Sequence, residues 1–244
     1  MTTPAYALSP LEEQRFGVRT VRVSDLERAQ LGGLLEYCRA NAVGLVIARC
    51  SSQDLATAQD LEEAGARLMD TLVYYLYDYA RHPGADYATR ATVRPVRPEE
   101  LEEICAMATR SFEGYHGHYH ADRRLDRAAC DEVYPSWVRH SILDRAFANE
   151  VFVSETDGRL SGFATMRLNS PEEGEGVLFG VAPWAQGKGL YRELIRRGQA
   201  WCREQGCARM VVSTQVTNLA VQKVWVRQGF EPSSSTYTFH LWLS

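Results

Sequence analysis

The stretch VLFGVAPWAQGKGLY, residues 177–191, decides the fold that we expect for this chain. An apolar strand runs into Pro183, and a glycine-rich turn at residues 186–189 then opens an amphipathic helix. Glycine lets a backbone approach a ligand closely, and the free N–H groups at a helix start favour an anion. The turn therefore predicts a cradle for a phosphate or pyrophosphate, with a plain strand-to-helix turn as the alternative. The sequence contains neither a GxxxxGK[ST] nor a GxGxxG motif, so the common nucleotide-binding loops are excluded.

Strands and helices alternate on both sides of this turn. Apolar runs and helical periodicity predict them in this order: strand 92–96, a helix after Pro98, a helix around 134–142, strands 151–154, 160–168 and 176–181, helix 189–203, strand 210–213, helix 218–227 and strand 236–243. The dipeptide Asp157-Gly158 predicts a tight hairpin between two of the strands.

The first third of the chain has the same alternation. Strands at 18–23, 43–48 and 68–79 enclose helices at 25–40 and 51–65, which gives a βαβαβ unit. Because Pro83-Gly84 breaks the pattern, we expect one domain at residues 1–88 and a second at 89–244. A helix ending in glycine precedes an aromatic strand at both Gly65 and Gly229. This similarity indicates a degenerate internal duplication or a chance likeness of two αβ units.

The motifs around the turn resemble the acyl-CoA loop of the GNAT (general N-acetyltransferase) superfamily, which usually reads Q/R-x-x-G-x-G/A. Gln186 and Gly189 match it, and Tyr191 takes the place of the last small residue. Further on, Asn218 and Gly229-Phe230 follow the superfamily's spacing. The resemblance covers about residues 92–244. It implies an α/β (α+β) fold, with a GNAT-like mixed central sheet flanked by helices, behind a smaller, half-GNAT-like N-terminal βαβαβ domain.

A closer resemblance is to the sugar-amine branch of that superfamily, which acetylates the 4-amino group of dTDP-4-amino-4,6-dideoxyhexoses. It rests on short segments at both ends of the chain: Arg15-Phe16-Gly17, His120-x-Asp122, Thr214-Gln215 and Phe239-His240-Leu241-Trp242. The resemblance implies direct acetyl transfer, in a ternary complex, from acetyl-CoA to the amine of a nucleotide-linked amino sugar. The alternatives are N-acetylation of another small amine and a non-catalytic acyl-CoA-binding module.

The resemblance also implies which residues bind acetyl-CoA, the acyl donor. They come from the strand, the turn and the two helices that follow: Phe179, Gly180, Val181, Gln186, Gly187, Lys188, Gly189, Leu190, Tyr191, Asn218 and Trp225. The family usually has a tyrosine at the position of Trp225 and uses it as the general acid. An indole N–H donates a hydrogen bond but gives up no proton usefully. Tyr191 and Tyr237 are therefore the candidate substitutes, unless the thiolate leaves without an enzymic acid and Trp225 only packs.

Candidate bases lie in the segment YHGHYH at residues 115–120. Histidine titrates near neutral pH, which suits amine deprotonation. We expect an extended loop with His120 as the base, Asp122 holding its ring, and His118 as the second choice. The alternatives are solvated histidines and a metal site, although no carboxylate or cysteine completes a metal-ligand spacing. The expected acceptor contacts are Tyr119, His120, Asp122, Arg123 and Gln215, with Arg123-Arg124 either holding a diphosphate or solvated.

Composition narrows the class of protein. The 244 residues include 27 Lys and Arg against 31 Asp and Glu, a net charge of −4, which disfavours non-specific nucleic-acid binding. No apolar run reaches the roughly 18 residues of a membrane span, and residues 1–6 lack the features of a signal peptide. The six cysteines contain no CxxC pair. We therefore expect a cytoplasmic protein with reduced thiols and no metal that acts on a small molecule, with a homodimer as its candidate assembly.

Overall fold

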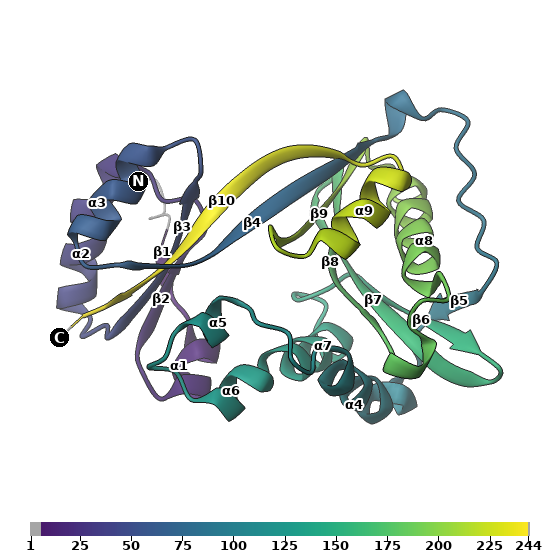
Figure 1. The fold of residues 1–244 in the computed structure, drawn as a ribbon, viewed down its shortest axis with the longest axis horizontal. Helices are drawn as coiled ribbons and strands as arrows, with labels where there is room; N and C mark the ends of the chain where they lie inside the picture. The colour runs from purple at the N-terminus through teal and green to yellow at the C-terminus, as the bar shows by residue number, and fades with distance from the viewer. Residues whose placement is uncertain (1–5, 244) are drawn as a thin grey trace.

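A computed structural model describes residues 6–243 of the chain. Its strands form one mixed sheet in the order β1-β2-β3-β10-β4-β9-β8-β7-β6-β5 (Figure 1). The strands are β1 (Tyr6–Leu8), β2 (Thr20–Val23), β3 (Leu45–Ser51), β4 (Arg67–Asp78), β5 (Thr92–Pro95), β6 (Glu150–Thr156), β7 (Arg159–Ser170), β8 (Glu173–Val181), β9 (Arg209–Gln215) and β10 (Glu231–Trp242). The expected mixed α/β fold is confirmed.

Helices cover both faces of the sheet. The α-helices are α1 (Pro10–Phe16), α2 (Leu31–Ala40), α3 (Leu55–Glu63), α4 (Leu101–Ser111), α5 (His118–Ala121), α6 (Arg127–Asp131), α7 (Val133–Leu143), α8 (Leu190–Glu204) and α9 (Leu219–Arg227). In Figure 1, α8 and α9 lie on one side of the second half of the sheet, and α4 and α7 lie on the other. α5 and α6 lie nearer the first half, where Tyr119 and Cys130 share a core with Ile47 of β3. No helix in the described part of the chain is long and apolar enough to span a membrane. Residues 1–5, most of the segment in which no signal peptide is expected, lie outside the described residues.

Most predicted elements are found close to their predicted bounds, and the hairpin at Asp157-Gly158 joins β6 to β7 with both residues at positive φ, 53° and 72°. Four short elements were not predicted: β1, α1, α5 and α6. The extended loop predicted at residues 115–120 is wrong, because α5 begins at His118. In this helical turn, His118 and His120 do not share one face as alternate residues of a strand would.

The two halves exchange their last strands. β10 pairs antiparallel with β3, from Thr236 opposite Ser51 to Trp242 opposite Leu45. β4 lies between β10 and β9 and pairs antiparallel with both. The order β2-β3-β10-β4-β9-β8 is therefore symmetric about the centre of the sheet, with the two long strands crossing from one half to the other (Figure 1).

The exchange ties the two hydrophobic cores together. Phe239 and Leu241 of β10 are buried in the N-terminal core, whereas Tyr75 and Tyr77 of β4 are buried in the C-terminal core. The boundary expected at residue 88 falls in the irregular segment between β4 and β5, but burial of each half's apolar strand requires the other half.

Local features repeat between the halves and favour duplication over chance. Asp54 and Asn218 cap α3 and α9 by accepting hydrogen bonds from the backbone N–H three residues on, at 3.0 and 3.4 Å. Gly65 and Gly229 follow the same two helices with φ of 91° and 86°, a conformation that favours glycine. A strand of 12 residues comes next in each half.

Candidate active site

The parallel strands β8 and β9 separate partway along their length. Their pairing runs from Glu173 opposite Arg209 to Gly176 opposite Val212. β8 then continues to Val181 and β9 to Gln215 without pairing to each other. Beyond Gly176 no other described strand pairs with this edge of β8, so its backbone N–H groups have no strand partner and remain open to a ligand. Among its carbonyls, that of Val181 accepts from Ser111 Oγ at 3.1 Å and from Gln186 Nε2 at 3.3 Å.

The turn after β8 presents a row of unused donors. Within the described residues, the backbone N–H groups of residues 187–192 have no acceptor. Gly187 and Gly189 reach the required conformation with φ of 75° and 82°. Because these donors meet the N-terminus of the 15-residue helix α8, the turn is suited to an anion.

Side chains of the predicted acetyl-CoA residues shape this end of the sheet. Gln186 Nε2 donates to the carbonyl of Val181 at 3.3 Å and braces the turn. Lys188 Nζ lies 5.4 Å from the ring centre of Trp184. No side chain fits at Gly180, since a Cβ there would lie 2.4 Å from the ring of Phe163. Leu190 is buried, and Asn218 donates to Thr214 Oγ1 at 3.1 Å while it caps α9.

Tyr191 and Trp225 form one aromatic unit beside the turn. Trp225 is 2% exposed, and its Nε1 donates to the Tyr191 hydroxyl at 3.1 Å. Tyr191 also packs against Phe179 of β8, with ring centres 5.6 Å apart. Burial raises the pKa of Tyr191 above its ordinary value, although the hydrogen bond from Trp225 opposes the shift. Tyr191 is therefore a protonated phenol whose own O–H remains available to donate.

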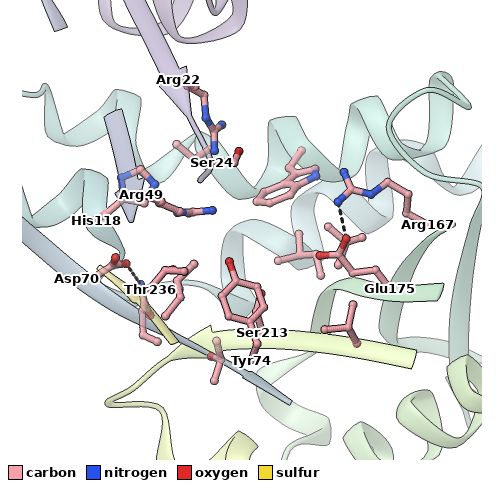
Figure 2. Close-up of a pocket in the computed structure, with 18 of the residues that line it drawn as sticks. Arg22, Ser24, Arg49, Asp70, Tyr74, His118, Arg167, Glu175, Ser213 and Thr236 are labelled. Atoms are coloured by element: carbon pink, nitrogen blue, oxygen red, sulfur yellow. Dashed lines mark hydrogen bonds and ion pairs between the residues drawn. The ribbon is translucent and has the colours of Figure 1, made fainter. Parts of the chain in front are cut away.

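A cavity of about 850 Å³ lies between the two halves and reaches the separated strands. Val177 and Leu178 of β8 and residues 213–215 of β9 line one part of it, and α1, β2 and β3 of the N-terminal half line another. Figure 2 shows Arg22 and Arg49 on one side of the pocket and the Arg167–Glu175 ion pair on the other. A volume of this size suits a ligand larger than a simple amine.

The arginines of the N-terminal half differ in how they are paired. Arg22 Nη1 lies 3.0 Å from Glu12 Oε1, and Tyr119 donates to the same carboxylate. Burial raises the pKa of Glu12, but Arg22 and the hydroxyls of Ser9 and Tyr119 bring it below its ordinary value, so Glu12 stays ionised. Arg49 has no carboxylate within 4 Å among residues 6–243, and its Nε donates only to Thr238 Oγ1 at 3.3 Å. Arg49 is therefore free to bind an anion.

The predicted base and acceptor residues do not form the expected arrangement. His118 and Tyr119 line the cavity, whereas His120 does not and lies 3.0 Å from Asp131. The expected contact between Asp122 and the His120 ring is wrong, since Asp122 Oδ2 instead accepts from His240 Nδ1 at 2.8 Å.

Three other predicted residues lie in different surroundings. Arg123 is exposed, and neither it nor Arg124 lines the cavity, while Gln215 does. Tyr237, an expected substitute acid, packs in the N-terminal core, because its strand position is opposite Cys50 of β3. Among residues 6–243, no cluster of three His, Cys, Asp or Glu side chains could hold a metal ion.

Several cavity residues were missed by the sequence reasoning. Arg49 could have been found, because a charge interrupts the apolar strand of residues 43–48 just before Cys50. Tyr115 lies beside the cap of α9. Burial raises the pKa of Tyr115, although hydrogen bonds with Thr214 and Asn218 oppose the shift. Asp70 had no signal, since its surroundings depend on the strand exchange. His240 belongs to a segment that the sequence resemblance singled out, and it does not line the cavity but contacts the lining residue His118.

Comparisons with known proteins fit this arrangement. The spore coat polysaccharide biosynthesis protein SpsD of Bacillus subtilis is 28% identical over 148 residues, 61% of this chain and 50% of SpsD. The mycothiol acetyltransferase of Streptomyces avermitilis is 35% identical over 80 residues, 32% of this chain and 26% of that protein. The chain thus spans half or less of the length of these relatives.

Solved structures share the fold over nearly the whole chain. The tandem GNAT protein from the clavulanic acid biosynthesis pathway has a TM-score of 0.63 at 17% identity, over 99% of this chain and 85% of that one. The GCN5-related N-acetyltransferase of Kribbella flavida has a TM-score of 0.64 at 13% identity, over 98% of this chain and 88% of that one. The Acetyltransferase (GNAT) family model matches residues 101–230. Since that match covers more than half of the chain, this protein belongs to the GNAT family of acetyltransferases.

Proposed function

We propose that this protein transfers the acetyl group of acetyl-CoA to the amine of a nucleotide-linked amino sugar of the dTDP-4-amino-4,6-dideoxyhexose type. The observation that carries the proposal is the cavity between the halves, with the unpaired Arg49 on one wall and the separated strands β8 and β9 on another. The relationship to SpsD, a polysaccharide biosynthesis protein, supports a sugar acceptor.

The donor binds on the side of the sheet where α8 begins. The pyrophosphate takes hydrogen bonds from the free N–H groups of residues 187–192, and the acyl arm lies along the open edge of β8. Backbone donors of that edge also polarise the thioester carbonyl and stabilise the charge that develops on its oxygen during attack. Asn218 and Trp225 flank the arm from α9.

The acceptor binds from the opposite side of the sheet. Arg49, with Arg22 and Arg15 nearby in the cavity, neutralises the diphosphate, because guanidinium groups pair with phosphate oxygens. Asp70 lines the same cavity; its buried Oδ1 has no hydrogen-bond partner among the described residues, and its Oδ2 accepts from Gln215 Nε2 at 3.4 Å. A carboxylate here suits the positive amine of the sugar, so the cavity offers both charges that such an acceptor needs.

The reaction forms a bond between the amine nitrogen and the acyl carbon and breaks the bond between that carbon and sulfur. The amine must lose a proton before it attacks, and the thiolate gains one as it leaves. In this proposal Tyr191 supplies the second proton, and the hydrogen bond that its oxygen accepts from the Trp225 indole supports the role.

The proposal is tested by acetyl transfer to dTDP-4-amino-4,6-dideoxygalactose in wild type and in Arg49→Ala. We expect Arg49→Ala to raise KM for the amino sugar by about tenfold to a hundredfold, the loss of one charge-assisted hydrogen-bonding group, while the Kd for CoA stays unchanged. Arg39→Ala is the matched control, because Arg39 is an exposed arginine of the same half outside the cavity. Equal turnover of amines without phosphate, unaffected by Arg49→Ala, would contradict the nucleotide sugar and favour acetylation of another small amine.

A further inference from the structure

A chain of buried polar side chains leads from the protein interior to the acceptor cavity. His118 of α5, Asp122 and His240 of β10 are 7%, 6% and 1% exposed. His118 Nδ1 lies 2.9 Å from His240 Nε2, and His240 Nδ1 lies 2.8 Å from Asp122 Oδ2. Trp242 Nε1 donates to the same Asp122 oxygen at 2.7 Å, and the backbone N–H of Arg124 donates to the other at 3.0 Å.

These contacts determine which nitrogen of each ring carries a proton. Burial raises the pKa of Asp122, but hydrogen bonds from His240, Trp242 and Arg124 bring it down to about 2, so the carboxylate is ionised and only accepts. His240 must then be protonated at Nδ1, which leaves its Nε2 as an acceptor. His118 therefore carries its proton on Nδ1 and donates it to His240, and the lone pair of His118 lies on Nε2.

That lone pair is accessible from the cavity. His118 lines the cavity beside Arg49 (Figure 2). Its Nε2 has no hydrogen-bond partner in the described part of the chain, yet it is not among the buried polar atoms that lack one, so it keeps accessible surface. A Cβ on the preceding Gly117 would lie 3.3 Å from Gln215 Nε2, which puts this turn against the open end of β9. The lone pair thus lies in the cavity beside the separated strands.

The charges around His118 keep it neutral until a substrate proton arrives. Burial, and then the charges of Arg49 of β3 and Arg22 of β2, hold the pKa of His118 well below its ordinary value. His240 of β10 and His120 would act in the same direction only if they were protonated. Asp70 of β4, which packs against α5, is the carboxylate that faces the cavity from that strand. A neutral imidazole at neutral pH can accept a proton at once.

We propose that His118 is the catalytic base of the acyl transfer and that His240 and Asp122 are positioning residues that fix its tautomer. The inference rests on the proposed function. An N–H bond of the bound ammonium breaks, its electron pair stays on nitrogen, and the proton goes to His118 Nε2. Asp122 balances the new charge through His240, as a carboxylate does for the imidazolium of a catalytic triad. The neutral amine then attacks the acyl carbon and the C–S bond breaks, with the thiolate taking its proton from Tyr191. The second proton that the nitrogen sheds as it becomes an amide restores the Tyr191 phenol, and His118 returns the first proton to water.

The first test needs no acceptor. Nitrogen-15 NMR of the free protein assigns the tautomer of each histidine ring. We expect neutral His118 to be protonated at Nδ1 and His240 at Nδ1, with the His118 tautomer becoming mixed in His240→Gln. A His118 ring protonated at Nε2 in the wild type would overturn the relay, whatever the enzyme does with amines.

The second test is the pH profile of kcat/KM for the amino sugar. In the wild type, activity falls as the pH drops through the His118 pKa, so the acidic limb lies below pH 6.5. His118→Gln should lower kcat/KM by about 10²-fold or more at neutral pH. Only the fraction of amine that is already neutral can then react, so the activity rises about tenfold per pH unit toward the amine's own pKa. Imidazole in the buffer should restore part of the activity of His118→Ala.

The positioning residues give a different signature. His240→Gln and Asp122→Asn should lower kcat by about tenfold to a hundredfold, with little change in KM and with the acidic limb moved to lower pH, because the imidazolium of His118 loses its stabilising partner. His116→Gln is the matched control, since His116 is an exposed neighbour in the same segment. A His118→Gln variant with the wild-type rate and limb would overturn the proposal, and a loss confined to His120→Gln would assign the base to His120. A wild type that is inactive with the amino sugar would contradict the proposed function instead, and the tautomer result then decides the relay.

Discussion

The two halves of the molecule contain the same unit, a pair of parallel strands joined by a helix, but only one pair separates. β2 pairs with β3 along its whole length, from Thr20 opposite Leu45 to Val23 opposite Ala48. β8 and β9 separate after Gly176 and Val212, and their ends line the cavity. A closed ladder leaves no backbone groups for a ligand, so the open pair alone can receive an acyl arm.

The turns that follow β2 and β8 also differ, because only the turn after β8 contains glycines in a left-handed conformation. Gly187 and Gly189 take positive φ after β8, whereas residues 24–31 after β2 contain no glycine and no positive φ. The N-terminal unit instead contributes arginines of β2 and β3 to the cavity of the other half. The N-terminal unit thus has the same fold without a glycine turn, and its side chains form a wall of the cavity beside the separated strands.

The largest effect is expected for a variant that disrupts the glycine turn of the C-terminal half. Gly189→Asp should weaken CoA binding by at least about 100-fold, or about 2.7 kcal/mol. The added carboxylate would put a negative charge beside the backbone N–H groups that bind the pyrophosphate, and it would repel the phosphates. Titration calorimetry measures the change. Gly206→Asp is the matched control, since Gly206 has nearly the same φ, 83°, at the other end of α8, and a Cβ added there would meet nothing within 4 Å. Unchanged affinity in Gly189→Asp would contradict the site.

A second prediction concerns the strand exchange. Phe239 is 2% exposed and belongs to β10, yet it packs in the N-terminal core. Phe239→Ala should lower the free energy of unfolding by about 3–5 kcal/mol, and circular dichroism and tryptophan fluorescence should follow one common transition in denaturant. Two transitions, with the C-terminal half still folded after the first, would show that the halves are two independent domains.

The smallest effect is expected at Trp225, where the family's tyrosine is replaced. Trp225→Phe keeps most of the buried ring area and removes only the indole donor to Tyr191, so kcat should fall by less than about tenfold. Tyr191→Phe removes the phenol itself and should lower kcat by about tenfold to a hundredfold. A fall of more than about 10²-fold in Trp225→Phe would mean that the indole N–H is needed in the reaction.

Local patterns in the sequence predicted most of the fold. The apolar run of residues 43–48, the Asp157-Gly158 turn and the helical spacing after Pro98 each determine their element through neighbours in the chain. The short helix α1 has a proline at its first turn and a left-handed Gly17 at its end, but seven residues are too few for a clear periodicity. The strand exchange could not be predicted, because β10 and β3 pair through residues that are 185 to 197 positions apart in the sequence.

In the candidate site, too, features set by neighbouring residues could be predicted, and contacts between distant residues could not. The glycine turn and a helix beginning at Asn218 were predicted, because their signals lie within a few residues of sequence, whereas the capping role of Asn218 was not. The partner of Asp122 was assigned wrongly, since His120 is two residues away while the true partner, His240, reaches it only through β10. The arginines of the N-terminal half were missed for a similar reason: the sequence does not tell which face of β2 and β3 borders the other half.

A crystal structure with CoA bound tests the central comparison most directly. We expect one CoA per chain, with pyrophosphate oxygens at hydrogen-bond distance, about 2.7–3.2 Å, from backbone nitrogens of residues 187–192, and with the thiol end between β8 and β9. A CoA bound instead to the N-terminal unit, with its pyrophosphate between residues 18 and 79, would contradict the account.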